Sequence, residues 1–181
     1  MQDLSLHILD VAENGINAGA NLILIEVNED IEKDRLTITI EDNGSGMEVD
    51  FLGRVLDPFV TTRTTRKVGM GLSLLEQTAQ AADGTLTVES TPGRGTRVTA
   101  DMSRSHIDRK PMGNMADTMT TLIAGNPDVD FTYVHRKSGQ EYRLDTREIR
   151  AELEEVPLNV PEVIELIRDN VVSGLEELSV S

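Results

Sequence analysis

The feature that most constrains the fold is a pair of β-rich runs joined by a polar stretch. Residues 21–27 read NLILIEV, residues 35–41 read RLTITIE, and NEDIEKD lies between them. Runs rich in isoleucine, valine and threonine are typical of strands, so the two predict an antiparallel hairpin with a longish loop. Before them, apolar residues recur at helical spacing over residues 4–17, and Gly19 supplies a stop. A helix followed by a hairpin is therefore expected.

The next segments repeat this pattern. We expect a short helix over residues 48–56, an exposed polar loop over residues 57–69, and an amphipathic helix over residues 71–83. A second hairpin follows, formed by residues 85–90 and 96–102 around the turn TPGRG. This order predicts a two-layer α/β sandwich in which helices cover one face of a mixed sheet.

The character of the chain changes after about residue 103. Residues 104–113 have the composition of a linker, and residues 114–181 predict a small α+β module. Within this module we expect a helix over residues 114–125, a hairpin over residues 131–145 around Ser138 and Gly139, and two further helices, the last beginning at Pro161. The predicted division is a domain of residues 1–103, a linker of residues 104–113 and an accessory module of residues 114–181.

Charge and composition exclude several classes of partner. The formal net charge is −15, and the chain has no cysteine. Such a charge repels nucleic acid and anionic membrane surfaces, so we expect neither as a partner. No apolar run reaches the roughly 20 residues of a membrane helix, and the first residues lack the basic start of a signal peptide. We expect a soluble, cytoplasmic protein in which local donors must hold any phosphorylated ligand.

Three glycine-rich segments lie at the ends of predicted elements. In DNGSGM, Gly44 and Gly46 permit positive φ and close backbone approach, and Asp42 at the strand end can accept a hydrogen bond from an exocyclic amine. In VGMGLSLL, Gly69 and Gly71 precede a helix whose free amide groups can hold phosphate. The third segment is GRGTRV. Each could be only a turn, because turns and helix starts are commonly rich in glycine.

A polar stripe runs along the first helix. His7, Asp10, Asn14 and Asn17 are spaced by three or four residues, so they share one face of the helix. Taken alone, the stripe is either a solvated face or a row of site residues.

With its glycine segments, the chain resembles the GHKL superfamily of ATPases, which share the Bergerat fold and include histidine kinases, the large heat-shock chaperone and type II topoisomerase. The resemblance covers residues 4–102. LDVAENGINAGA is similar to the N box, DPFVTTR to the F box of histidine kinases, and DNGSGM, VGMGLSLL and GRGTRV to the three glycine boxes. These five motifs occur in the family's order.

The resemblance implies ATP and Mg²⁺ as cofactors. It implies that Asn14 ligates magnesium, that Asp42 receives the adenine amino group and that Thr96 lies near the same base. The remaining residues implied in cofactor binding come from the glycine boxes and the loop between them, which supplies the local cations: Gly44, Gly46, Met47, Thr62, Arg63, Lys67, Gly69, Met70, Gly71 and Leu72.

Position 10 bears on the reaction. Family members that hydrolyse ATP or phosphorylate serine carry an acid four residues before the N-box asparagine, whereas histidine kinases usually carry asparagine there. Here the residue is Asp10, which implies a general base, with Glu13 in reserve. The alternative is that Asp10 only caps or pairs on the surface.

Three functions follow from the resemblance: a slow ATPase whose nucleotide state regulates a protein partner, a protein kinase acting in trans on serine or histidine, and a sensor without turnover. The whole chain also resembles stand-alone bacterial ATP-binding proteins encoded beside subunits of iron hydrogenases or NADH-oxidising complexes, which makes such subunits candidate partners. The sequence leaves open whether the chain forms a homodimer.

Overall fold

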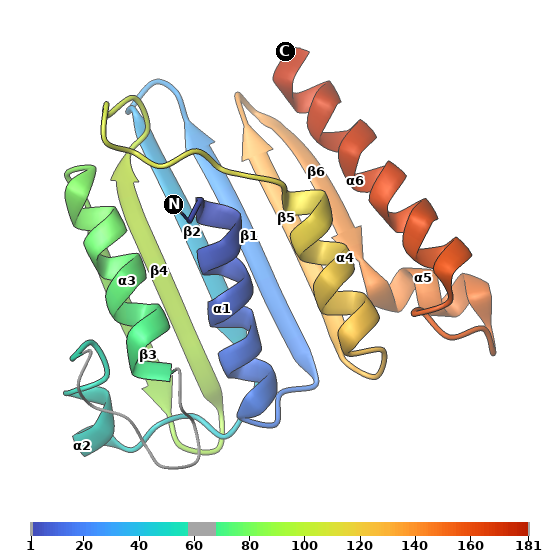
Figure 1. Cartoon of the computed structure of the whole chain (residues 1–181), viewed down its shortest axis with the longest axis horizontal. Coiled ribbons are helices and arrows are strands. Elements are labelled where there is room, and N and C mark those ends of the chain that lie inside the picture. The colour runs from blue at the N-terminus through green and yellow to red at the C-terminus, as the bar shows by residue number, and fades with distance from the viewer. Residues whose placement is uncertain (1, 58–67, 181) are drawn as a thin grey trace.

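The computed structural model describes residues 2–57 and 68–180. Their strands form one mixed sheet of six strands in the order β3-β4-β2-β1-β5-β6, and α1, α3 and α4 lie across one face of it (Figure 1). The α/β sandwich expected from the sequence is confirmed. In chain order the elements are α1 (Leu4–Asn17), β1 (Leu22–Asp30), β2 (Arg35–Asp42), α2 (Val49–Leu52), α3 (Val68–Ala81), β3 (Thr85–Thr91), β4 (Gly95–Ser103), α4 (Met115–Gly125), β5 (Asp130–Lys137), β6 (Gln140–Asp145), α5 (Thr146–Leu153) and α6 (Pro161–Val180).

Helix α1 has the bounds expected from its spacing. It begins where the Asp3 carboxylate accepts a hydrogen bond from the Leu6 backbone N–H at 3.1 Å, which satisfies one of the free amides of the first turn. Leu4 and Ile8 on its apolar face are fully buried against the sheet. Gly19, at φ +84°, turns the chain toward β1.

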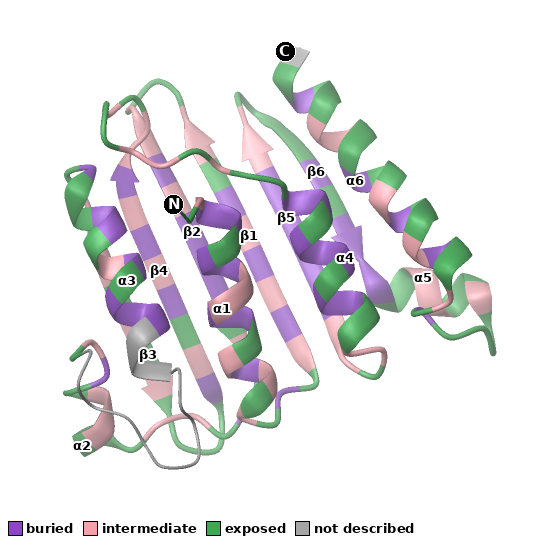
Figure 2. Cartoon of the chain, in the orientation of Figure 1, coloured by how far each residue is buried: buried purple, intermediate pink, exposed green. Residues whose placement is uncertain are grey.

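The first hairpin supplies the centre of the sheet. β1 and β2 are antiparallel as expected, with Ile25 opposite Ile40. Ile23, Ile25 and Val27 alternate along β1 and are fully buried. Figure 2 shows this alternation as bands of buried residues beneath the helices. Burying apolar area of this kind is the main stabilising contribution to such a core, at roughly 25 cal/mol per Å².

The C-terminal segment continues the same sheet. β5 pairs in parallel with β1, and β6 pairs with β5 through a turn in which Ser138 and Gly139 both have positive φ. Phe131 and Tyr133 of β5 are fully buried in the same core as the residues of β1. The boundary near residue 103 stays a prediction. The segment after it is built on the central sheet, since β5 pairs with β1. An isolated two-stranded hairpin would have only marginal stability in water.

Residues 104–113 connect the two parts, and both ends of this segment are hydrogen-bonded to the first part. The backbone N–H groups of Leu4 and Ser5 donate to the carbonyl oxygens of Pro111 and Met112, at 3.0 and 2.7 Å. At the other end, both the hydroxyl and the backbone N–H of Ser105 donate to the Asp34 carboxylate. These hydrogen bonds therefore hold the connecting segment in place at both of its ends.

Two helix boundaries differ from the sequence-based expectation. α2 spans only four residues, Val49–Leu52, since residues 53–56 continue as turns. α3 begins at Val68 rather than at residue 71, so its first turn contains Gly69, which the sequence pattern assigns to the preceding loop. No helix within the described ranges is long and apolar enough to cross a membrane.

Candidate functional site

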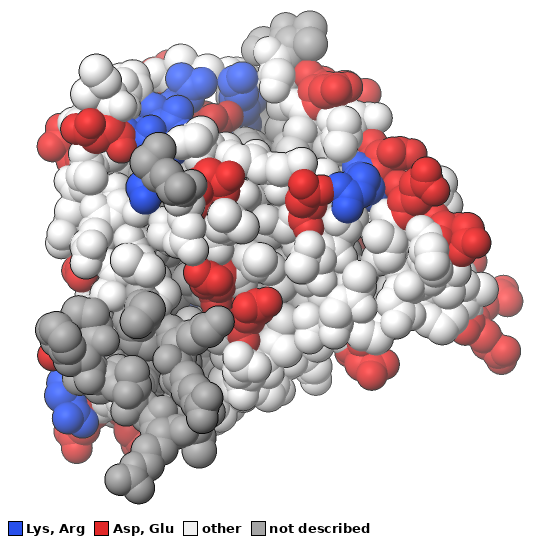
Figure 3. All heavy atoms as spheres, in the orientation of Figure 1, with Lys and Arg blue, Asp and Glu red and all other residues white. Residues whose placement is uncertain are grey.

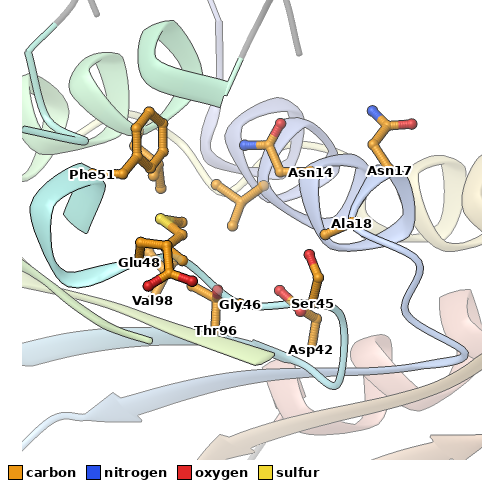
Figure 4. Close-up of a pocket in the computed structure, with 13 residues that line it drawn as sticks. Asn14, Asn17, Ala18, Asp42, Ser45, Gly46, Glu48, Phe51, Thr96 and Val98 are labelled. Atoms are coloured by element: carbon orange, nitrogen blue, oxygen red, sulfur yellow. The ribbon is translucent and has the colours of Figure 1, made fainter. Parts of the chain in front are cut away.

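A cavity of about 370 Å³ opens between the C-terminal half of α1, the end of β2 and the start of α3 (Figure 4). Asn14 points into it from α1, while Asp42 and Thr96 lie on the sheet side. Both come from strand ends that face each other, because Asp42 of β2 pairs with Thr96 of β4. The lining residues are Val11, Asn14, Asn17, Ala18, Asp42, Ser45, Gly46, Met47, Glu48, Phe51, Leu72, Thr96 and Val98.

Asp42 is fixed by backbone donors. The Gly44 N–H donates to Asp42 Oδ1 at 2.9 Å, and the Thr96 N–H also donates to this carboxylate. Burial raises the pKa of the Asp42 carboxyl, and these two hydrogen bonds act in the opposite direction. An ionised carboxylate accepts about four hydrogen bonds, so Asp42 keeps acceptor capacity toward the cavity.

The DNGSGM loop is fastened to the end of α1. The Asn43 side-chain oxygen accepts from the Asn21 and Leu22 backbone N–H groups at 2.9 and 3.1 Å. The Ser45 N–H donates to the Ala18 carbonyl oxygen at 2.9 Å. The loop is therefore more than a turn between two elements, because its hydrogen bonds join the sheet to the helix that carries Asn14.

Two glycines of this loop have different roles. Gly46 has φ +70°, and a Cβ there would lie 2.1 Å from the Thr91 carbonyl oxygen. Gly44 does not have positive φ, but a Cβ there would lie 2.9 Å from the Ala18 carbonyl oxygen. Gly44 is beside the cavity and Gly46 lines it.

A hydroxyl network supports Thr96 and Met47. The Ser90 hydroxyl accepts from the Met47 N–H at 2.8 Å and donates to the Gly95 carbonyl oxygen at 3.0 Å. Because Ser90 has one hydroxyl proton, the Thr96 hydroxyl, 2.8 Å from it, is the donor in their contact. The oxygen of Thr96 is then left as an acceptor at the cavity wall.

Asp10 lies outside this cavity, in an adjoining one. The second cavity, of about 240 Å³, is lined by Asp10, Glu13 and Gly71 and shares Asn14 and Asn17 with the first. A Cβ on Gly71 would lie 3.7 Å from the Asp10 Cβ and 3.9 Å from the Asn14 Nδ2. α3 therefore passes directly over the Asp10–Asn14 face of α1.

His7, the first member of the polar stripe, is buried rather than part of either cavity. It is 2% exposed, and its Nε2 lies 3.2 Å from the Thr78 hydroxyl of α3. Burial, followed by the charge of Lys110, lowers the pKa of His7. The stripe thus divides into one residue of the α1–α3 contact and three residues that line cavities.

Other predicted site residues belong to α3 and the loop before it. Leu72 lines the first cavity, and Gly69 and Met70 lie in the first turn of α3. Thr62, Arg63 and Lys67 lie outside the described residues, as does most of the expected polar loop.

Sequence reasoning assigned no site role to several wall residues. Helical spacing marks Val11 as core-facing, but the same spacing does not tell a core residue from one beside a cavity. No pattern points to the others, because their positions depend on how α2 and the loop fold back on the sheet. The missed residues are Val11, Ala18, Ser45, Glu48, Phe51 and Val98.

The residues present fit a nucleotide and its metal ion. Val11, Leu72 and Val98 give apolar walls for a planar base, with Asp42 as the polar group that orients it. The Asn14 Nδ2 is buried without a hydrogen-bond partner among the described residues, which leaves an N–H donor for an acceptor such as a phosphate oxygen, while Oδ1 is the atom that would ligate a metal ion. These residues contain no cluster of three or more His, Asp or Glu side chains that could hold a metal alone. Mg²⁺, which is commonly held by one or two protein groups together with substrate phosphates, suits this donor set.

Several curated proteins are similar to part of this chain. The Non-motile and phage-resistance protein of Caulobacter vibrioides is 31% identical over 112 residues, which cover 57% of this chain and 13% of that protein. Sensor protein kinase FleS of Pseudomonas aeruginosa is 38% identical over 92 residues, covering 51% and 23%. The chain thus spans less than a quarter of the length of these relatives.

Two solved structures share the fold. The N-terminal domain of a DNA repair protein has a TM-score of 0.53 at 18% identity, covering 80% of this chain and 53% of that one. The Aquifex aeolicus MutL ATPase domain complexed with ADP has a TM-score of 0.52 at 16% identity, covering 86% and 68%.

The sequence model described as "Histidine kinase-, DNA gyrase B-, and HSP90-like ATPase" matches residues 2–106, which include all residues of both cavities. Since this match covers more than half of the chain, the chain belongs to this ATPase family and carries its ATP-binding domain.

Proposed function

We propose that the protein binds Mg-ATP in the first cavity, hydrolyses it slowly and uses its nucleotide state to regulate a protein partner. The observation that carries this proposal is the convergence of Asp42 and the unpartnered amide of Asn14 on one apolar cavity. The cytoplasmic location expected from the sequence, and the hydrogenase or NADH-oxidising subunits as partners, are part of the proposal.

Asp42 recognises the adenine base. Its carboxylate accepts from the exocyclic amine of adenine, while the Thr96 hydroxyl oxygen offers a second acceptor nearby. Val11 and Val98 exclude water from the ring faces. A base lacking the amine leaves the acceptor position of this buried carboxylate that faces the cavity unfilled, which is costly, so such a base is disfavoured.

Asn14 and Asp10 act at the phosphate end. The Asn14 amide oxygen would hold Mg²⁺ together with the phosphates, and the bound ion would neutralise charge that builds up on the phosphate oxygens. Asp10 lies one helical turn before Asn14 in the adjoining cavity, where it accepts a proton from the attacking water. The amide groups at the start of α3, with the positive end of its dipole, favour the phosphates.

A second candidate is a protein kinase acting in trans. The adjoining cavity, at about 240 Å³, is larger than a single water molecule needs, and a serine or histidine side chain of a partner could enter it. Sensor kinases among the relatives favour this candidate. A sensor that binds ATP without turnover is the third.

Replacing Asp10 by asparagine separates these functions. We expect ATP hydrolysis to fall at least about 100-fold, the typical contribution of a general base, while ATP affinity is kept. Glu13→Gln tests the reserve base, since Glu13 lines the same cavity but projects from α1 in another direction. Turnover should be kept in this variant, and a loss there with normal turnover in Asp10→Asn would move the role to Glu13. Unchanged turnover in Asp10→Asn would remove Asp10 from the mechanism. If the unaltered protein binds ATP but shows no turnover, the third candidate, a sensor without turnover, is the function that remains.

Labelled ATP tests the kinase directly. The protein is incubated with γ-labelled ATP and an extract of its own cells, and Asp10→Asn serves as the control. Transfer of label to an extract protein, dependent on Asp10, would establish the kinase and replace the ATPase assignment.

A further inference from the structure

A groove separate from the two cavities described above lies between β6, α5 and α6. It encloses about 340 Å³. Leu144, Val163 and Ile167 form its buried floor, with exposures of 5, 7 and 3%. Ile149 and Leu153, on one face of α5, form a half-buried wall.

The rim of this groove presents an unusually exposed apolar side chain. Leu166 of α6 lines the groove and is 68% exposed. Leu166 lines the same groove as Leu144, Val163 and Ile167 and extends their apolar surface outward, and a contiguous apolar surface rimmed by polar residues is typical of an interaction site. The proposed ATP chemistry uses none of these residues.

The charge of the rim is net acidic, since Asp145, Glu148 and Glu152 line the groove together with Arg143. Glu148 and Glu152 of α5 line the groove, and both are exposed. No ion pair reaches either of them within residues 2–57 and 68–180. Asp145, which also lines the groove, is already neutralised by Arg143 and Arg147 at 3.0 and 2.8 Å, and these arginines lower its pKa to about 2.

The arginines of the two helices are used elsewhere. Arg147, Arg150 and Arg168 pair with carboxylates outside α5 and α6: Asp145, Asp130 and Asp117. Arg147 is attracted by Glu148, but these three arginines form their ion pairs with aspartates rather than with Glu148 or Glu152. Figure 3 shows acidic side chains gathered along the side of the molecule that α5 and α6 form.

We propose that this groove binds a cationic amphipathic segment of a partner protein. The apolar face of the segment lies against Leu144, Val163 and Leu166, and its lysines or arginines meet Glu148 and Glu152. Such a pattern of apolar anchors in a groove with charges at its edge is a common mode of helix recognition. A second copy of this chain is a poorer occupant, because its net charge of −15 would meet the acidic rim.

A binding assay on the full chain tests this assignment. The probe is a fluorescent synthetic peptide with leucine and lysine at helical spacing, and a scrambled peptide of equal composition is its control. Fluorescence anisotropy is measured for the unaltered protein, Leu166→Asp and Glu148→Lys/Glu152→Lys. We expect the helical peptide to bind at least about tenfold more tightly than the scrambled one, and each variant to lose at least about tenfold.

The contradicting outcomes are distinct. Glu32→Lys/Glu76→Lys makes the same charge change away from the groove, so an equal loss in this control would mean long-range attraction and overturn the proposal. Equal binding of the scrambled peptide, or none by the helical one, would also overturn it. If Leu166→Asp instead dissolves a homodimer seen by sedimentation, the groove belongs to a second copy. Unchanged melting temperatures show that the variants remain folded.

Discussion

Gly15 of α1 lies directly against Asp42 of β2, so closely that a Cβ on Gly15 would be 2.7 Å from the Asp42 Cβ and 2.9 Å from its Oδ2. The absence of a side chain at Gly15 therefore sets how near the helix comes to the carboxylate. It couples the element that carries Asn14 to the one that carries Asp42.

Gly15→Ala is expected to weaken ATP binding at least about tenfold and to lower the melting temperature, because the helix must move away from Asp42. Helix propensity alone predicts the reverse, a gain of up to about 1 kcal/mol. Gly125→Ala is the control, since a Cβ at Gly125 would meet nothing within 4 Å. Calorimetry that found normal affinity in Gly15→Ala would mean that the close approach is unimportant for the cavity.

Thr96→Val removes a hydroxyl without changing the shape of the side chain. The Ser90 hydroxyl keeps its partners at Met47 and Gly95, so we expect little change in the melting temperature of the free protein. ATP affinity should fall about fivefold, which corresponds to the ~1 kcal/mol of one hydrogen bond. Thr99→Val, on the opposite face of β4, should bind ATP normally. Equal affinities in the two variants would exclude the Thr96 hydroxyl from base recognition.

Asn14→Ala tests the magnesium assignment. In the unaltered protein ATP should bind more tightly with Mg²⁺ than with a chelator, and Asn14→Ala should lose most of this difference. Asn17→Ala, on the same helix and lining both cavities, is expected to retain it. Titrations in which Asn14→Ala keeps the full dependence on Mg²⁺ would mean that other groups hold the ion.

His7 should make the fold sensitive to mild acid. Because the pKa of His7 is lowered in the folded protein, protons bind more strongly to the unfolded chain, and stability present above about pH 6.5 is lost as the pH falls. The loss approaches at most ~1.4 kcal/mol per pH unit for one proton. In urea denaturation at pH 7.5 and 5.5, His7→Gln should lose less stability than the unaltered protein. Equal losses would contradict this.

Much of the fold could be predicted because its signals are local. The spacing of Leu4, Ile8 and Ala12 and the turn at Ser138–Gly139 each involve neighbouring residues, and the structure confirms the elements they predict. The parallel pairing of β5 with β1 is not local, since it joins residues more than 100 positions apart, such as Ile25 and Tyr133. No turn chemistry marks such a pairing, which explains why the C-terminal segment reads as a separate module.

The structure brings together three of the residues to which the resemblance gives a site role, while their roles stay predictions. Asp42, Asn14 and Thr96 come from motifs in a fixed order, and they line one cavity. Gly15, Phe51 and Ser45 contribute space or shape, which becomes visible only when helix and sheet are packed together. The groove at Leu166 could not be predicted for the same reason. The apolar spacing of α6 predicts which of its residues are buried, but it does not predict that Leu166 stays exposed beside them.

The ionisation of Asp42 links base recognition to pH. Burial raises its pKa, so above that pKa its charge costs the folded protein stability, and this cost is relieved as the pH falls through the folded pKa. Asparagine at this position should therefore leave the melting temperature of the free protein unchanged or raised. ATP affinity of the unaltered protein should decline as Asp42 is protonated, because the protonated carboxyl is a poorer acceptor.

Calorimetric titration of Asp42→Asn with Mg-ATP tests the central claim most directly. We predict saturable binding to the unaltered protein and a loss of at least about 100-fold in the variant, with its melting temperature kept. The reason is that asparagine replaces one carboxylate oxygen, which accepts from the adenine amine, by an NH₂ group that only donates. Normal affinity in a folded Asp42→Asn protein would contradict the assignment of this cavity to adenine.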